Sequence, residues 1–525
     1  MSLASTERLA GVLLHPTSLP GPHGCGDFGP AAYHYIDWLA TAGQRLWQVL
    51  PLTPVGPGNS AYASVSAFAG SPLLVALEPL VERGWLASPS AEELAVLPHD
   101  RVDFDRVAPW RMSQLRAAEA GFRAKATTTE RAAFTAFCDA QSHWLADYTL
   151  FMAIDEQYRA EQCWAWARWA PGLAMREPSA LAAARQKHAA EIDFHAFVQW
   201  CFFTQWRALM DYAHGKGVQI VGDLPIFVAH HSADCWANRH LFLLDAAGEP
   251  QVVAGVPPDF FSATGQRWGN PLYDWEAMAK DGFAWWIARV KHEMTRGDLV
   301  RIDHFRGFAG YWEIPASCPT AIDGRWVPAP GQALFEALSR AFDGELPVIA
   351  EDLGVITPDV EALRDGFGLP GMKILQFGFG GDGAHEFLPH NFKSANCCVY
   401  TGTHDNDTAR GWWYGATERE RGYAAAYLGT ESAPVDEHNV HWAMIRTCWA
   451  SIARIAVCQM QDALGLDGHA RMNVPGQMGH WTWRFQWSQV GPEPAEHLMR
   501  LSATYGRAPI ERLGLAAYPV DRQLP

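Results

Sequence analysis

The stretch LVRIDHFRG, Leu299–Gly307, begins with an apolar run and continues through an arginine, an aspartate and a histidine. Three other short runs have a similar form: VQIVGD, PVIAED and MKILQF. Parallel strands that are buried on both faces consist of such nearly continuous apolar runs. We therefore expect a parallel sheet whose strands alternate with helices.

Eight runs of this kind occur along the chain, separated by longer segments with helical spacing. Eight βα units predict a closed (β/α)8 TIM barrel of the α/β class. The predicted strands are Leu9–Leu14, Leu46–Leu50, Val218–Asp223, Leu299–Asp303, Pro347–Glu351, Met372–Phe377, Cys397–Thr401 and Arg471–Val474.

The uneven spacing of the runs indicates two insertions. Roughly 165 residues separate the second run from the third, whereas βα loops usually have about 2–6 residues. Segments such as Glu130–Ala160 have helical spacing and few helix breakers, so we expect a mostly helical subdomain over residues 56–215. Residues 224–298 are rich in Gly, Pro and aromatic residues, which favours a long folded loop over the active face. Both insertions are expected to belong to a single catalytic domain, residues 1–525.

Composition narrows the classes of partner and location. The 525 residues are 49% hydrophobic and carry 41 Lys and Arg against 57 Asp and Glu, a net charge of −16. This balance argues against nucleic acid or an anionic membrane as a partner. The chain contains no window of about 18 consecutive apolar residues, so we expect no membrane span. Its ten cysteines include no C-x-x-C pair, which favours reduced thiols. We expect a soluble, cytoplasmic protein.

Acidic residues stand at the ends of four predicted strands. In a barrel the carboxyl ends of all strands meet at one rim, so residues far apart in sequence share one pocket. The alternative is helix capping, because an Asp after a strand often caps the next helix. Four such positions together favour the shared pocket. The acids are Asp223, Asp303, Glu351 with Asp352, and Asp405 with Asp407.

The period of a strand distinguishes two of these acids. Residues two apart face the same side, so Arg301 would hold Asp303 ionised by charge attraction and hydrogen bonding. Glu351 instead ends the apolar run Val348–Ala350, and apolar surroundings raise the pKa of a carboxyl group. One charged and one protonated carboxyl group are what the cleavage of a glycosidic bond requires.

The same motifs resemble those of the 4-alpha-glucanotransferases, the amylomaltase or disproportionating-enzyme family (glycoside hydrolase family 77). The likeness extends from about Gly11 to the C-terminus. It rests on GVLLHPTSLPGPHGCGDFG, DLPIFVA, GVPPDFFSATGQRWGNPLYD, LVRIDHFRGF, PVIAEDLG and YTGTHDND.

The resemblance implies a fold, an activity and a set of site residues. The fold is a retaining barrel without a C-terminal β domain. The activity transfers an α-1,4-glucan segment from one maltooligosaccharide to the 4-hydroxyl of another glucan or of glucose. The nucleophile is Asp303, the general acid/base is Glu351, and Asp405 stabilises the transition state. The residues implied to bind substrate are Tyr62, Asp223, Gln266, Trp268, Arg301, His304, His404, Asn473 and Pro475.

The resemblance also implies that no cofactor or metal is needed. The expected partners are maltooligosaccharides and α-1,4-glucans as donor and acceptor, and the expected state is a monomer or a weak homo-oligomer. Transfer requires that water be kept from the intermediate. The predicted lid is the loop Val253–Trp268, with Phe260, Phe261 and Trp268.

Two positions depart from the family pattern. Ala61 replaces the usual proline before Tyr62, which bears on the stiffness of that loop. Ala263 stands where an acidic residue is common, which bears on the preference for donor and acceptor.

Other functions remain open at this stage. A retaining α-glucan hydrolase would use the same residues. A metal-dependent hydrolase could use Asp303, His304, Glu351, Asp352, His404 and Asp405 as ligands, although Arg301 would repel a cation. A glycan-binding protein without catalysis would not need the two carboxyl states. GFGGDG (Gly378–Gly383) is a weak nucleotide motif, and His385, Glu386 and His390 do not have zinc-helix spacing.

Overall fold

Eight parallel strands form a closed barrel, which confirms the predicted fold class. The computed structural model describes residues 7–258 and 262–515. Neighbouring strands around the barrel follow the order β1-β12-β11-β10-β9-β6-β3-β2. Their bounds are β1 Leu9–Leu13, β2 Leu46–Gln48, β3 Gln219–Leu224, β6 Leu299–Ile302, β9 Val348–Ala350, β10 Gly371–Ile374, β11 Cys397–Tyr400 and β12 Ile455–Gln459.

Alternate residues of each strand face the barrel interior and the surrounding helices. Leu299 belongs to the apolar cluster inside the barrel, while Val300 and Ile302 pack in a cluster with residues of the outer helices. This alternation follows from the two-residue period of a strand. Arg301 therefore lies on the inner side of β6, in register with Asp223 of β3.

The predicted eighth strand is wrong. Arg471–Val474 has no regular secondary structure, and the eighth strand is β12, which begins sixteen residues earlier in the chain. The run SIARIAVCQM around β12 directly follows the helix α18, Val440–Ala450. A short apolar run next to a helix can continue the helix or form a strand, and periodicity alone does not distinguish the two. The other seven predicted strands overlap observed ones. The predicted strand Met372–Phe377 is too long, because β10 ends at Ile374 and Leu375–Gly378 is helical (α15).

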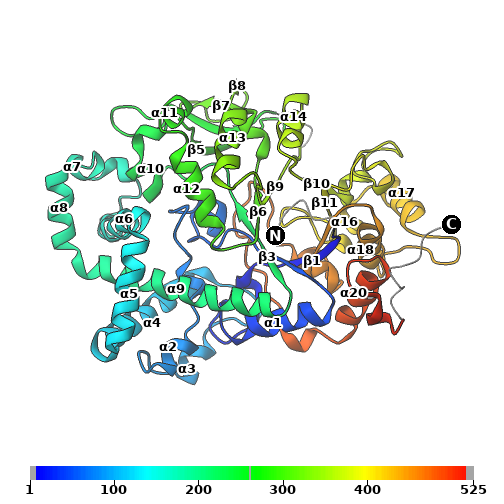
Figure 1. Ribbon diagram of the computed structural model, residues 1–525, viewed down its shortest axis with the longest axis horizontal. Helices are drawn as coiled ribbons and strands as arrows, with labels where there is room; N and C mark the ends of the chain where they lie inside the picture. The colour runs from blue at the N-terminus through cyan, green and yellow to red at the C-terminus, as the bar shows by residue number, and fades with distance from the viewer. Residues whose placement is uncertain (1–6, 259–261, 516–525) are drawn as a thin grey trace.

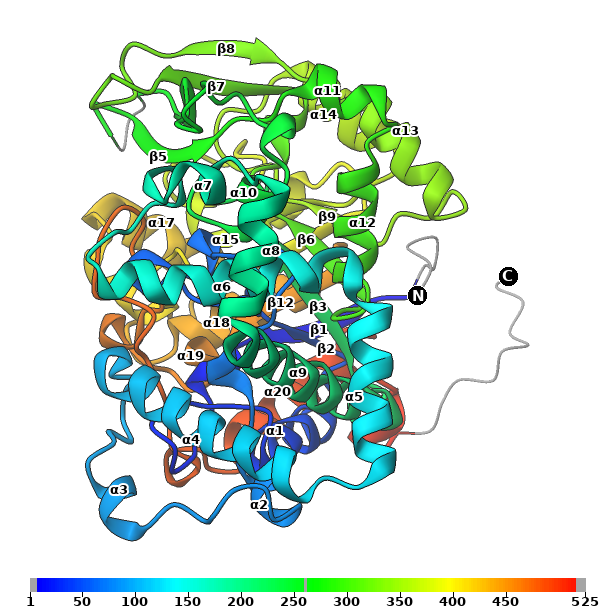
Figure 2. The same cartoon turned by 90° about the vertical axis from the view of Figure 1, so that its left-hand side faces the viewer.

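Helices fill most of the long interval between β2 and β3. In Figure 1 they gather at the left of the barrel, and Figure 2 shows them from that side. The longest, α9, packs on α6 within this group and then leads directly into β3. Their bounds are α2 Glu78–Glu82, α3 Ala91–Ala95, α4 Phe104–Lys125, α5 Thr128–Ala140, α6 Ser142–Ala160, α7 Pro171–Ala174, α8 Pro178–Lys187 and α9 Ala189–Gly215.

The segment after β3 contains regular structure that the sequence analysis treated as a loop. Two of its segments, β4 (Val252–Val256) and β5 (Gln266–Pro271), join β7 (Gly310–Pro315) and β8 (Arg325–Pro328) in an antiparallel sheet of order β5-β4-β7-β8. This sheet lies above the barrel strands, at the top of Figure 2. The interval also contains α10 Ala233–Ala237, α11 Trp275–Lys280 and α12 Ala284–Glu293.

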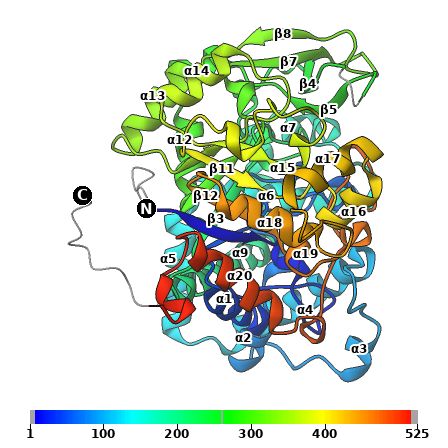
Figure 3. The ribbon, with the colours of Figure 1, turned by 90° about the vertical axis from the view of Figure 1, so that its right-hand side faces the viewer.

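The remaining helices complete the outer layer, and Figure 3 shows those near the C-terminus together on one side. Up to residue 515 no strand follows β12, and none of the described helices has the length and apolar character to cross a membrane. All ten cysteines are free. The bounds are α1 Pro30–Thr41, α13 Gly331–Ala341, α14 Pro358–Gly366, α16 Ala409–Gly415, α17 Glu418–Leu428, α19 Met460–Ala463 and α20 Glu493–Thr504.

Candidate active site

Arg301 joins two acids from adjacent strand ends at the mouth of the barrel. Its Nη1 donates to both carboxylate oxygens of Asp223 at 2.9 Å, and its Nη2 donates to Oδ1 of Asp303 at 2.8 Å. Burial opposes the charge on Arg301, but the two carboxylates outweigh it and hold the pKa of the guanidinium well above its usual value. Arg301 is therefore a fixed positive charge behind Asp303.

Asp303 and Glu351 lie in different surroundings. The Asp303 side chain is 30% exposed, whereas Glu351 is 9% exposed. Burial and then the charge of Asp303 raise the pKa of Glu351 to about 8, with Arg301 opposing. Glu351 accepts hydrogen bonds from the backbone N–H of His304 at 2.6 Å and of Leu353 at 2.9 Å, which fix its orientation. The arrangement provides an exposed acid beside a buried one that holds a proton at neutral pH.

His304 follows Asp303 directly and has a left-handed backbone, with φ of 53°. This conformation is uncommon for a non-glycine residue, and such residues often occur at functional sites. It lets the His304 N–H point at Glu351 while the ring meets Trp268 edge-on, with 4.8 Å between ring centres. Burial lowers the pKa of His304 to about 4, so the ring is neutral at pH 7.

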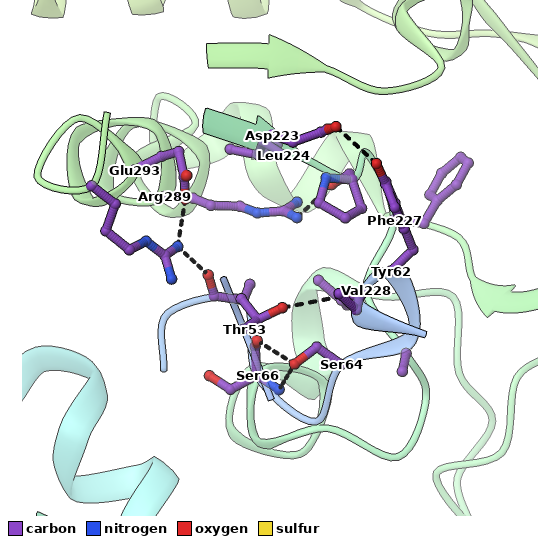
Figure 4. Close-up of a pocket in the computed structure, with 15 residues that line it drawn as sticks. Thr53, Tyr62, Ser64, Ser66, Asp223, Leu224, Phe227, Val228, Arg289 and Glu293 are labelled. Carbon is purple, nitrogen blue, oxygen red and sulfur yellow. Dashed lines mark hydrogen bonds and ion pairs between the residues drawn. The ribbon is translucent and has the colours of Figure 1, made fainter. Parts of the chain in front are cut away.

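Tyr62 and His404 form the opposite wall. Their rings are stacked with centres 5.1 Å apart and an angle of 10° between them. The Tyr62 hydroxyl donates to Oδ2 of Asp223 at 2.8 Å. Figure 4 shows the side chains of Tyr62 and Asp223 pointing toward each other at one edge of a small cavity. The far side of this cavity is formed by α12 residues such as Arg289 and Glu293.

Asp405 is the third acid at the mouth, with a side chain 41% exposed. Asn473 donates from Nδ2 to its Oδ1 at 2.6 Å, and Arg471 donates to its carbonyl oxygen at 2.5 Å. His404 Nε2 lies 3.3 Å from the same Oδ1. Burial lowers the pKa of His404, so this contact involves a neutral ring at pH 7.

Comparisons with known proteins agree with this geometry. The family model described as 4-alpha-glucanotransferase matches residues 14–489. The chain belongs to this family. Among its relatives, the 4-alpha-glucanotransferase of Thermus thermophilus is 50% identical, with 94% of this chain and 98% of that protein covered. The enzyme of Synechocystis is 46% identical, with 95% and 98% covered.

A solved structure gives the same result for the fold. The amylomaltase of Streptococcus agalactiae, in complex with acarbose, superposes with a TM-score of 0.90 at 37% identity and covers 96% of this chain and 100% of that one. The amylomaltase of Corynebacterium glutamicum, at 18% identity and a TM-score of 0.76, shares the fold.

Two of the acids at the barrel rim do not face the cleft. Asp352 is buried, ion-paired with Arg364, and accepts from the backbone N–H of Met372 at 2.7 Å. Asp407 accepts from the N–H of Thr408 at 2.8 Å, just before α16. Both acids therefore hold neighbouring backbone, but neither is a helix cap: Asp352 bonds to β10, and the cap of α16 is Thr408.

The remaining predicted residues lie at the edge of this group. Gln266 begins β5 and accepts from Trp268 Nε1 at 3.1 Å, and the Trp268 ring is 39% exposed. Pro475 is exposed, two residues beyond Asn473. Phe260 and Phe261 lie outside the described residues, as do parts of the predicted lid.

The two departures from the family pattern have different surroundings. Ala61 is buried, and its carbonyl accepts from Thr53 Oγ1 at 3.1 Å, while Ser60 accepts from the Tyr62 N–H at 3.2 Å. These bonds hold the Tyr62 turn. Ala263 is exposed.

The metal-dependent alternative conflicts with the observed contacts. Two groups of His and acidic residues among those described lie close enough to share an ion: His23 with Asp27 and Glu78, and Glu156 with Glu191 and His195. Neither includes a residue of the barrel mouth. At the mouth, Arg301 is ion-paired with Asp223 and Asp303, so a cation bound to Asp303 would lie next to this positive charge.

Sequence reasoning missed Trp481 and Arg471. Trp481 is 5% exposed, and its ring centre lies 5.9 Å from that of Tyr62 and 5.6 Å from that of His404. Its φ of 71° is strained for a bulky residue. Arg471 was assigned to a strand, so its contact with Asp405 was not foreseen. No local pattern marks either residue, because both roles arise from contacts across the fold.

Proposed function

We propose that 4-alpha-glucanotransfer on α-1,4-glucans, the activity of the family, proceeds in this chain by double displacement with Asp303 as nucleophile. Glu351 donates a proton to the glycosidic oxygen while Asp303 attacks the anomeric carbon. A covalent glucosyl-enzyme forms, and Glu351, now ionised, removes the proton from the 4-hydroxyl of an incoming glucan. The acceptor attacks from the same side, so the α-1,4 linkage is restored.

The observation that carries this proposal is the pair of unlike carboxyl groups. Arg301 donates a hydrogen bond to Asp303 and places a positive charge next to this carboxyl group. Glu351, with a pKa raised to about 8 by burial and by Asp303, holds a proton at neutral pH. A nucleophile must be ionised and a general acid protonated in the same state of the enzyme. The hydrogen bond from Arg301 to Asp303 and the burial of Glu351 support this division of roles.

Asp405 is proposed to stabilise the transition state. Its exposed carboxylate and the neutral ring of His404 would contact sugar hydroxyls as the oxocarbenium-like charge develops. Tyr62 would stack on the sugar ring. The proposed contacts to the glucan come from Asp223, Gln266, Trp268, Arg301, His304, Asn473 and Pro475.

Exclusion of water would favour transfer over hydrolysis. The exposed Trp268, which lies edge-on to His304, provides an apolar surface next to the two catalytic carboxyl groups. A glucan chain lying on it would cover the intermediate. We further propose a cytosolic location, which the ten free thiols favour, and retain the expectation of a monomer or weak homo-oligomer.

Maltotriose alone distinguishes transfer from hydrolysis. Incubation is expected to give glucose together with a ladder of maltooligosaccharides longer than the substrate, measured by chromatography over time. The retaining hydrolase would give glucose and maltose without longer chains. Products dominated by these two sugars from the earliest time points would contradict transfer.

The reaction is expected to slow at alkaline pH. The first step needs the proton on Glu351, and its pKa of about 8 means that this proton is present below that value and lost above it. We expect kcat/KM for maltotriose to fall about tenfold for each pH unit above about 8. A profile that stays level to pH 10, in enzyme whose circular dichroism is unchanged, would contradict the acid role.

A further inference from the structure

The loop 401–409, which carries His404 and Asp405, is held at both ends by one side chain. Asp462 Oδ2 accepts a hydrogen bond from Thr401 Oγ1 at 2.6 Å. Its Oδ1 accepts from the backbone N–H of Ala409 at 2.6 Å. Thr401 follows β11 and Ala409 begins α16, so a single carboxylate connects the point where the loop leaves the barrel to the point where it enters a helix.

Asp462 is fully buried just after β12, the strand next to β11. A buried carboxylate is costly unless it is paired or hydrogen-bonded. Within the described chain no basic nitrogen forms an ion pair with it, and burial raises its pKa to about 6. The two hydrogen bonds to the loop are therefore its compensating contacts, and the loop and the acid constrain each other.

The middle of the loop is held from below by two amides. The Asp407 carbonyl accepts from Gln376 Nε2 at 2.9 Å and from Gln459 Nε2 at 3.3 Å. Gly402 lies against the same amides, and a Cβ added there would come within 2.9 and 3.0 Å of their nitrogens. The loop backbone thus rests directly on side chains from the two neighbouring strand ends.

The opposite side of the loop faces the cleft. Asp405 is the exposed member, while Thr401, Thr403 and His404 are buried. Asn473 and Arg471 also contact Asp405, but a shift of the loop backbone would carry the Asp405 carboxylate with it, because the residue is part of the loop. The contacts of Asp462 are on the buried side, where no part of a glucan can reach.

We propose that Asp462 is a positioning residue for transglycosylation, fixing the place of Asp405 and His404 against the reacting sugar. The inference rests on the role proposed above for Asp405. A group that acts mainly on the transition state must be placed accurately, and a displacement of about 1 Å can cost on the order of 10²-fold in rate. Ground-state binding depends less on such accuracy, so the effect should fall on kcat rather than on KM.

The test compares Asp462→Ala with Asp462→Asn. The alanine removes both acceptors and should lower kcat for maltotriose by about 30- to 100-fold with KM within about threefold. The asparagine should restore most of kcat, since its oxygen can accept from Ala409 while the Thr401 hydroxyl turns to accept from its amide. The matched control is Asp155→Ala, another buried acid with two partners, located in α6. It should lower the melting temperature and leave kcat unchanged.

Acarbose provides a readout that a merely structural role would not change. Its flattened ring and protonated nitrogen imitate the oxocarbenium ion. The Kd of acarbose should rise in Asp462→Ala by about the same factor as kcat falls. The Kd of maltotriose, measured in a Glu351→Gln background, should change less than about threefold.

Two results would overturn the inference. One is a folded Asp462→Ala enzyme with kcat within threefold of wild type, and the other is equal weakening of acarbose and maltotriose. If the alanine variant does not fold, Thr401→Val takes its place, with an expected loss of kcat of about tenfold that Thr401→Ser restores; an unchanged kcat would overturn the inference as well. Asp405→Asn is measured in parallel. Full activity of Asp405→Asn would refute the role proposed for Asp405. If Asp405→Asn is inactive while Asp462→Ala is active, only the positioning role of Asp462 is refuted.

Discussion

Asp303→Asn is expected to lower kcat by about 10⁴-fold or more while leaving glucan affinity nearly unchanged. The amide has almost the same shape but cannot attack the anomeric carbon. Arg301 remains bonded to both oxygens of Asp223, so the architecture of the mouth does not depend on the replaced group. The measurements are turnover of maltotriose and its Kd by calorimetry.

The matched control is Asp352→Asn. Asp352 follows β9, the next strand of the barrel, and is ion-paired with Arg364. Its kcat should stay within a few-fold of wild type. Redistribution of maltotriose at a near wild-type rate by Asp303→Asn would show that the nucleophile is a different residue. A large loss in both variants would point to unfolding, which the melting temperature detects.

Glu351→Gln is expected to lose about 10³-fold in kcat on maltotriose but much less in the first step on maltosyl fluoride. Fluoride leaves without a proton, so a donor of this kind does not need the acid. Transfer of the glucosyl group from Asp303 to an acceptor sugar still needs Glu351 as the base, so the glucosyl-enzyme should accumulate. Azide needs no base and should therefore release the glucosyl group. The alkaline limb near pH 8 should also disappear with the carboxyl group.

An amide at position 351 can accept only one of the two backbone N–H groups that bind the carboxylate, so some loss of stability is expected. The melting temperature is therefore measured alongside. Equal loss on maltotriose and maltosyl fluoride, without rescue by azide, would contradict the acid/base role.

The strands of the barrel could largely be predicted because their signal is local. Runs such as VQIVGD and LVRID are apolar on both faces, and burial between the core and the helices requires that composition. The two-residue period of a strand predicts that Arg301 lies beside Asp303. In the structure Arg301 Nη2 donates a hydrogen bond to Asp303 Oδ1 at 2.8 Å. The prediction of a raised pKa for Glu351 from its apolar neighbours is also met by the structure.

The error at the eighth strand shows where local signals fail. β12 lies in a longer apolar stretch that also suits a helix, so its assignment depends on pairing with β1 and β11. Because the strand was misplaced, the acid that follows it, Asp462, was not recognised at a strand end. The antiparallel sheet was missed for a related reason, since β4 gains its partners from segments on both sides of β6.

The sequence by itself determined seven of the eight barrel strands, the acids at their ends and the apolar surroundings of Glu351, because these depend on composition and period within a few residues. Only the tertiary structure decided that Asp352 and Asp407 hold backbone, that Trp481 lies against Tyr62 and His404, and that Asp462 holds the loop of Asp405. Each of those contacts joins groups from different strands or loops, and closure of the barrel brings them together.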